Sequence, residues 1–156
     1  MGMGKWSILL FLMGMRMKAF LLCTFMVFSF AMITGCQSAE TMVLLDEEVR
    51  EIKVSKSEGL GGINDEESFI SFKDRKSIAV FEKAITSAVK QSGNADISKP
   101  KYDIAVEYKG ELPSHGIHLW LGEDNEKSVF MYITDESVYL TSPEMTIKLR
   151  SLILSK

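Results

Sequence analysis

Cysteine is scarce in this chain, whose 156 residues include only Cys23 and Cys36. Residues 37–156 contain none, which excludes disulfides, thiol catalysis and cysteine-ligated metals from that part of the chain. Methionine is also sparse after residue 36, where only Met42, Met131 and Met145 occur. A methionine-rich copper site is therefore not expected.

Basic residues are fewer than acidic residues beyond residue 35. Three of the 18 basic residues, Lys5, Arg16 and Lys18, precede that point, whereas all 21 acidic residues follow it, and 15 basic against 21 acidic residues leave a net charge of −6. No Lys/Arg cluster offers the phosphate-neutralising patch that nucleic-acid binding requires. We therefore expect no nucleic-acid partner.

Several catalytic motifs are missing as well. The glycines of Ser57–Asn64 have no following Gly-Lys-Ser/Thr, so this stretch is interpreted as a hairpin loop and not as a phosphate cradle. No Gly-x-Ser-x-Gly nucleophile elbow is present. Paired acids for glycoside hydrolysis could come from turns or exposed strand positions, where ordinary solvated carboxylates are expected; these are Glu107, Glu111, Glu123 and Asp124.

The N-terminal quarter has the pattern of a secretory signal: a basic region with Arg16 and Lys18, the apolar run Ala19–Ile33, and small residues before a cysteine. The sequence Ile33-Thr34-Gly35-Cys36 resembles the lipobox of bacterial lipoproteins. That resemblance implies removal of residues 1–35 and a diacylglycerol on the Cys36 sulfur, with Ile33, Thr34 and Gly35 recognised by the signal peptidase. The alternatives are an incidental cysteine after an apolar leader, or an uncleaved transmembrane helix.

A second apolar run, Trp6–Met13, makes this leader unusually long, so translation starting at Met15 or Met17 is a further hypothesis. Residues 36–48 are interpreted as a tether that lifts the domain off the membrane, and residues 49–156 as one extracytoplasmic domain. The acidic run at 46–48 is interpreted as a solvated part of that tether.

Periodicity predicts the elements of this domain. Strands are expected at 49–55 and 68–73, then a helix capped by Asp74 and ended by Gly93-Asn94, with an apolar stripe that includes Ala88 and Val89. Strict alternation predicts strands at 102–109, 117–121 and 129–133, and a short strand at 138–140. A capping box formed by Thr141 and Glu144 predicts a closing helix at 141–154. This order favours an α+β fold with a single antiparallel sheet and two helices packed on one face.

Part of this pattern is similar to a known family. The block from Phe72 through the first helix, then Pro100-Lys101-Tyr102-Asp103, Leu119-Trp120-Leu121 and the closing helix, resembles the YhfM-like small lipoproteins of Gram-positive bacteria. The resemblance implies a cell-membrane location on the extracytoplasmic face and a domain of this shape. These motifs are fold-level, and they imply no catalytic activity.

His115 and His118 are the only histidines. Because they are three residues apart on an extended chain, they are expected on opposite faces and therefore do not converge on a metal. A Ser/His/Asp triad stays open by composition, but neither histidine has a recognisable nucleophile beside it. We expect no metal and no cofactor besides the diacylglycerol.

The second face of the sheet is the candidate binding surface. If 117/119/121 and 129/131/133 lie under the helices, four ring-bearing side chains share the other face: His118, Trp120, Phe130 and Tyr132. An exposed apolar patch of that kind is typical of a partner surface, although other parts of the chain or a second copy could cover it. The favoured function is a membrane-tethered, non-enzymatic binding or accessory module whose partner is an envelope protein or wall component. The alternative is an envelope hydrolase that uses His118 with a nearby carboxylate.

Overall fold

The computed structural model describes residues 39–63, 70–92 and 98–155. These residues belong to one compact unit, Ala39–Lys156. The predicted signal peptide and lipobox, Ile33, Thr34, Gly35 and Cys36 included, lie outside the described residues.

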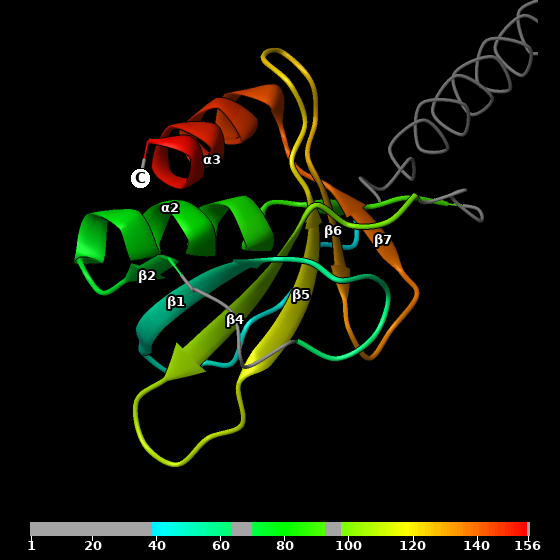
Figure 1. The fold of residues 1–156 in the computed structure, drawn as a ribbon. Helices are drawn as coiled ribbons and strands as arrows, with labels where there is room; N and C mark the ends of the chain where they lie inside the picture. The colour runs from blue at the N-terminus through cyan, green and yellow to red at the C-terminus, as the bar shows by residue number, and fades with distance from the viewer. Residues whose placement is uncertain (1–38, 64–69, 93–97, 156) are drawn as a thin grey trace, which may run out of the picture. The chain divides into compact units, whose positions relative to one another are not determined.

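The core element is a seven-stranded sheet in which every neighbouring pair is antiparallel. Its strands are β1 (Val49–Lys56), β2 (Ile70–Phe72), β3 (Val89–Lys90), β4 (Tyr102–Tyr108), β5 (His115–Trp120), β6 (Val129–Tyr132) and β7 (Val138–Leu140), in the spatial order β2-β1-β4-β5-β6-β7-β3. Two helices, α2 (Arg75–Thr86) and α3 (Pro143–Leu154), pack on one face of the sheet (Figure 1). The predicted α+β fold is confirmed.

Helix α2 begins where the sequence predicts. The Asp74 carboxylate accepts a hydrogen bond from the Ser77 backbone N–H at 2.9 Å, which satisfies one of the free donors of the first turn. The predicted stripe is buried in the core, with Ile78, Phe81 and Ile85 at 2% exposure or less. In the described part of the chain, no helix has the length and hydropathy needed to cross a membrane.

The end of α2 differs from the prediction. The helix stops at Thr86, and Val89 lies in β3, where it pairs with Leu140 of β7. Ala88 and Val89 match the helical period, but the Ala88 N–H bonds to the Ile85 carbonyl in a tightened last turn, and the next residues gain strand partners on both sides. Tertiary pairing therefore overrides local periodicity here.

The closing helix starts one residue later than the predicted capping box implies. Its N-cap is Ser142, whose hydroxyl accepts from the Met145 N–H at 3.3 Å, and Pro143 occupies the first helical position. Thr141 is buried, and its hydroxyl has no hydrogen-bond partner in the described structure. Ile147 and Leu154 of this helix are exposed, whereas Met145, Leu149 and Ile153 are buried.

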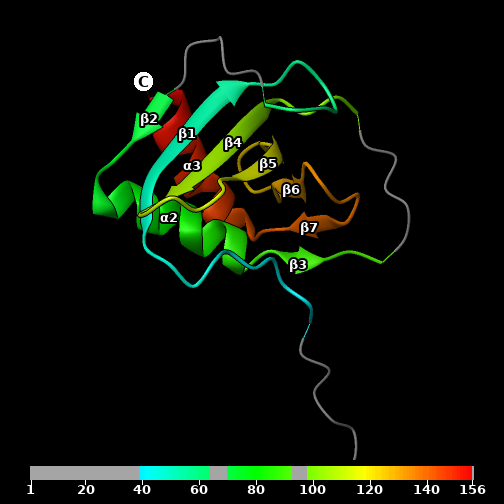
Figure 2. The ribbon, with the colours of Figure 1, turned by 90° about the horizontal axis from the view of Figure 1, so that it is seen from below.

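Residues 40–48 run from the sheet edge at β3 to the start of β1, and we refer to them as the N-terminal strap (Figure 2). Thr41 forms an isolated antiparallel bridge with Val89, and the Met42 N–H bonds to the Ala88 carbonyl at 3.1 Å. Met42 is only 1% exposed and belongs to the core. The predicted tether, residues 36–48, is therefore not a free spacer from residue 40 onward, because Met42 is buried in the core and the backbone at residues 40–42 pairs with the sheet edge.

Candidate functional site

The four residues predicted to form one binding surface lie on two faces of the sheet. Phe130 pairs with Leu119, and Tyr132 pairs with Ile117, so both share the face that the helices cover. Phe130 is completely buried there. His118 and Trp120 lie on the other face, which we refer to as the outer face. The prediction of a single aromatic surface is wrong.

The register of β5 and β6 explains the error. Each odd-numbered residue of β5 faces an even-numbered residue of β6, as in the pair Leu119 and Phe130. The prediction had placed odd-numbered residues of both strands under the helices. A shift of one residue moves a whole strand pattern to the opposite face, so the length of the 121–128 connection decided the outcome.

On the outer face, His118 and Asp103 form a buried pair. Their side chains are each 2% exposed, and the His118 Nδ1 lies 2.7 Å from an Asp103 carboxylate oxygen. Trp120 meets the imidazole edge to face at a ring distance of 6.1 Å, and its indole N–H donates to the Ser98 carbonyl at 2.7 Å. The imidazole is thus held in one orientation, as a catalytic histidine would be.

The neighbouring serine is on the wrong side for a catalytic triad. Ser55 pairs directly with Asp103, and its buried hydroxyl has no hydrogen-bond partner in the described structure. Across the strands the order is therefore Ser55, Asp103, His118, with the carboxylate between the other two. A serine nucleophile must instead reach the far nitrogen of the histidine.

His115 lies on the helix-covered face, opposite to His118, as the spacing predicted. Its Nδ1 is 2.6 Å from the Tyr108 hydroxyl, and its ring is 5.9 Å from the ring of Tyr132. Burial lowers the pKa of His115, because the charged imidazolium loses hydration. Burial likewise raises the pKa of Tyr108 and of Tyr132.

The candidate acids are surface groups. Glu107 forms ion pairs with Arg50 and Lys53, and the hydrogen bond from Lys53 is the main cause that lowers the pKa of this carboxyl. Glu123 and Asp124 each lie 3.0 Å from the Arg150 guanidinium. Glu111 is exposed. The lowered pKa of Glu107 is opposite to the raised pKa that a general acid needs.

Two tyrosine hydroxyls hold the N-terminal strap beneath α2. The Tyr132 hydroxyl accepts from the Val43 N–H at 2.8 Å and donates to the Val43 carbonyl at 2.6 Å, as a neighbouring strand would. The Tyr108 hydroxyl accepts from the Leu45 N–H at 3.3 Å. The strap is thereby fixed in an extended conformation.

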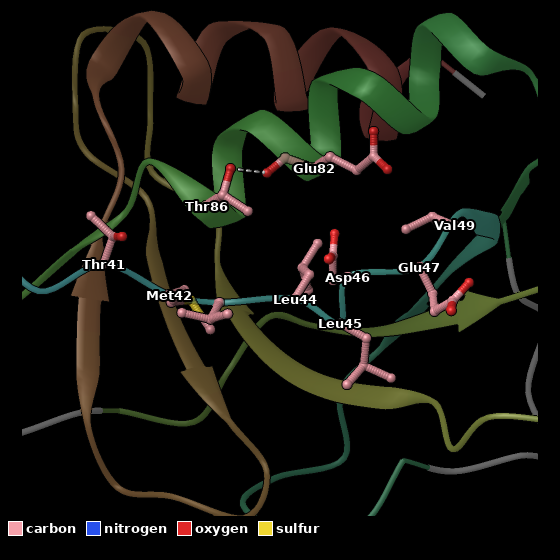
Figure 3. Close-up of a pocket in the computed structure, with 10 residues that line it drawn as sticks. Thr41, Met42, Leu44, Leu45, Asp46, Glu47, Val49, Glu82 and Thr86 are labelled. Atoms are coloured by element: carbon pink, nitrogen blue, oxygen red, sulfur yellow. Dashed lines mark hydrogen bonds between the residues drawn. The ribbon is translucent and has the colours of Figure 1, made fainter.

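A groove of about 500 Å³ lies between the strap and α2 (Figure 3). Leu44 and Asp46 point toward α2, whereas Leu45 points away from it. The lining is mostly apolar with three carboxylates: Thr41, Met42, Val43, Leu44, Leu45, Asp46, Glu47, Val49, Glu82 and Thr86. This is the concave surface that the sequence analysis missed. The available signal was the run of four consecutive apolar residues from Met42 to Leu45, which is unusual for a solvated tether.

Comparison with known proteins agrees with this architecture. The model of the YhfM protein family matches residues 46–156. No curated protein matches the sequence. Among solved structures, a thioesterase-like protein from Clostridium sporogenes has a TM-score of 0.54 at 17% identity, with 69% of this chain and 96% of that chain covered. At this identity the likeness concerns the fold alone.

Proposed function

The chain belongs to the YhfM family, and we propose that it is a lipid-anchored lipoprotein on the extracytoplasmic face of the cell membrane, where it acts as a non-enzymatic binding or accessory module. The observation that supports the proposal is the position of Cys36 at the end of a lipobox-like sequence, three residues before the folded unit begins at Ala39. Three residues span at most about 11 Å. Lipidation would therefore hold the strap and its groove close to the bilayer.

The chemistry of the two candidate sites supports binding more than catalysis. The groove beside the strap is open and concave, as a ligand site requires. The oriented histidine of the outer face, His118, is only 1% exposed, so a substrate could not reach it without local opening. The expected partner is an envelope protein or a wall component, and the membrane is reached through the anchor.

The lipid anchor is tested by feeding an alkyne analogue of palmitate to a Gram-positive host that expresses the full chain. We expect the label on the wild type and on Cys23→Ala, and its loss in Cys36→Ala. Intact mass should show residues 1–35 removed from the labelled forms only. Label retained on Cys36→Ala would refute the anchor, and label lost equally from both variants would point to a processing defect unrelated to the lipobox.

A hydrolase is the second candidate, favoured by the Asp103–His118 pair alone. Its test is the turnover of a thioester, a nitrophenyl ester and wall fragments; the thioester is included because the solved neighbour is described as thioesterase-like. Activity lost in His118→Gln and kept in His115→Gln would establish this function and replace the binding proposal. Equal background rates in all three proteins would remove the hydrolase.

A further inference from the structure

The groove between the N-terminal strap and α2 combines an apolar floor with negative charge. Met42, Leu44 and Val49 supply the floor, and Met42 and Val49 are themselves part of the buried core. Asp46 projects from the strap toward α2, between Leu44 and Val49 (Figure 3). Glu82 lines the opposite side of the groove, where its side chain runs along α2. An occupant would therefore meet apolar side chains and carboxylates at once.

The carboxylates of the groove are poorly neutralised by the protein itself. In the described structure, neither Asp46 nor Glu47 has an ion-pair partner. Glu82 lies 3.4 Å from the Arg75 guanidinium, a side chain that is 65% exposed. The next acid along, Glu48, differs because Lys109 pairs with it at 2.8 Å, and that hydrogen bond lowers its pKa. Negative potential thus remains at the groove.

We propose that this groove binds a short extended peptide segment of a partner protein that presents a lysine or arginine beside apolar side chains. The inference deepens the proposed binding function and rests on it. A cation at the carboxylates complements their charge, and apolar neighbours remove water from the floor. The volume, about 500 Å³, falls within the range of about 300–1,000 Å³ found for small-ligand sites, which fits a few residues and not a domain face. Anionic lipid headgroups are disfavoured by the same carboxylates.

The probe is a fluorescein-labelled hexapeptide, Gly-Leu-Lys-Val-Lys-Leu, and its matched control carries glutamate in place of both lysines. The full chain is taken from the membranes of the expressing host into nanodiscs of zwitterionic phosphatidylcholine, so that the bilayer itself does not attract the probe. Binding is read by fluorescence anisotropy. We expect saturable binding of the basic peptide, weaker binding at high salt, and no binding of the acidic peptide.

Charge-neutralising variants locate the site. Asp46→Asn and Glu82→Gln should each weaken binding by about 1.4- to fivefold, the range of an exposed ion pair. Leu44→Ala removes part of the apolar floor, and it should also weaken binding of the basic peptide. Asp124→Asn is the matched control, because it removes one exposed negative charge from the β5–β6 turn, outside the lining of the groove. Melting temperatures establish that every variant is folded.

Three results would overturn the proposal: equal binding of the basic and acidic peptides, unchanged binding in Asp46→Asn and Glu82→Gln, or an equal loss in Asp124→Asn. A concentration-dependent dimer that Leu44→Ala abolishes, with no peptide binding, would assign the groove to a second copy instead. Mass analysis of the same preparation reports the lipid on Cys36. An unlipidated protein that binds the peptide contradicts the anchor alone, and a lipidated protein that does not bind contradicts the groove.

Discussion

Removal of one hydroxyl group should release the N-terminal strap. In Tyr132→Phe, the ring stays in place while both hydrogen bonds to Val43 are lost. A hydrogen bond contributes about 0.5–1.5 kcal/mol net, so the two together contribute about 1–3 kcal/mol. Both bonds are exposed, and water can replace the lost partners. We therefore expect the free energy of unfolding to fall by about 1–2 kcal/mol.

The substitution should change hydrogen exchange in the strap more than in the rest of the domain. If the strap opens as a unit, amide hydrogen exchange at Val43 should accelerate about tenfold for each 1.4 kcal/mol lost. Amides of the central strand β4 should keep their protection relative to global unfolding. Urea denaturation measures the total stability, and exchange followed by NMR measures the strap.

The matched control is Tyr102→Phe, which removes a tyrosine hydroxyl that has no hydrogen bond in the described structure. This change should alter stability by less than about 0.5 kcal/mol. Equal effects of the two substitutions, or unchanged exchange at Val43 in Tyr132→Phe, would refute the reasoning. Residues 40–48 would then behave as the flexible tether that the sequence pattern first indicated.

Three further predictions follow from burial and pairing. Phe130→Ala should lower the free energy of unfolding by about 3–5 kcal/mol, measured by urea denaturation, because it leaves a cavity in the core. Leu112, which is 43% exposed, should lower it little when changed to alanine. Equal losses in the two variants would contradict the observed register. Asp103→Ala removes the buried partner of a histidine and should lower the free energy of unfolding by about 1–3 kcal/mol. Ser55→Ala removes a hydroxyl that has no partner in the described structure, and should leave stability unchanged or increase it. A larger loss in Ser55→Ala than in Asp103→Ala would show that the Ser55 hydroxyl has a partner. For His115, whose pKa is lowered by burial, the unfolded chain binds a proton near pH 6.5 before the folded chain does, so stability should fall as pH drops below about 6.5. Chemical denaturation between pH 8 and pH 5 should show a smaller fall in His115→Gln, and identical slopes would remove this residue as the cause.

Local sequence patterns predicted most of the helices and strands of the fold. Asp74 capped its helix because a short acid before an apolar stripe has the same role in any helix of this kind. The alternation in β4 and β5 matched the observed strands to within two residues at each end, because one face of each is buried against the helices. Opposite placement of the two histidines followed from the same period of two.

The residues that form the candidate site were harder to predict from local sequence patterns. Alternation places Phe130 and Tyr132 on one face together, but it does not say which face. The strap was missed for a related reason, since its apolar side chains lie beside an acidic run that is typical of a solvated segment. Its partners, Tyr108 and Tyr132, are more than 60 residues away in the chain.

The sequence by itself determined the α+β class, the antiparallel hairpins and the family resemblance, because these depend on short-range periodicity, capping and turn residues. Tertiary structure alone decided the register of β5 against β6, the extra strand β3, and the packing of the strap under α2. Strand β3 and the strap depend on contacts between residues distant in the chain, and the register depends on the geometry of the hairpin connection; in each case several pairings satisfy the same local pattern. Only the packed core, with Phe130 inside and Trp120 outside, selects one of them.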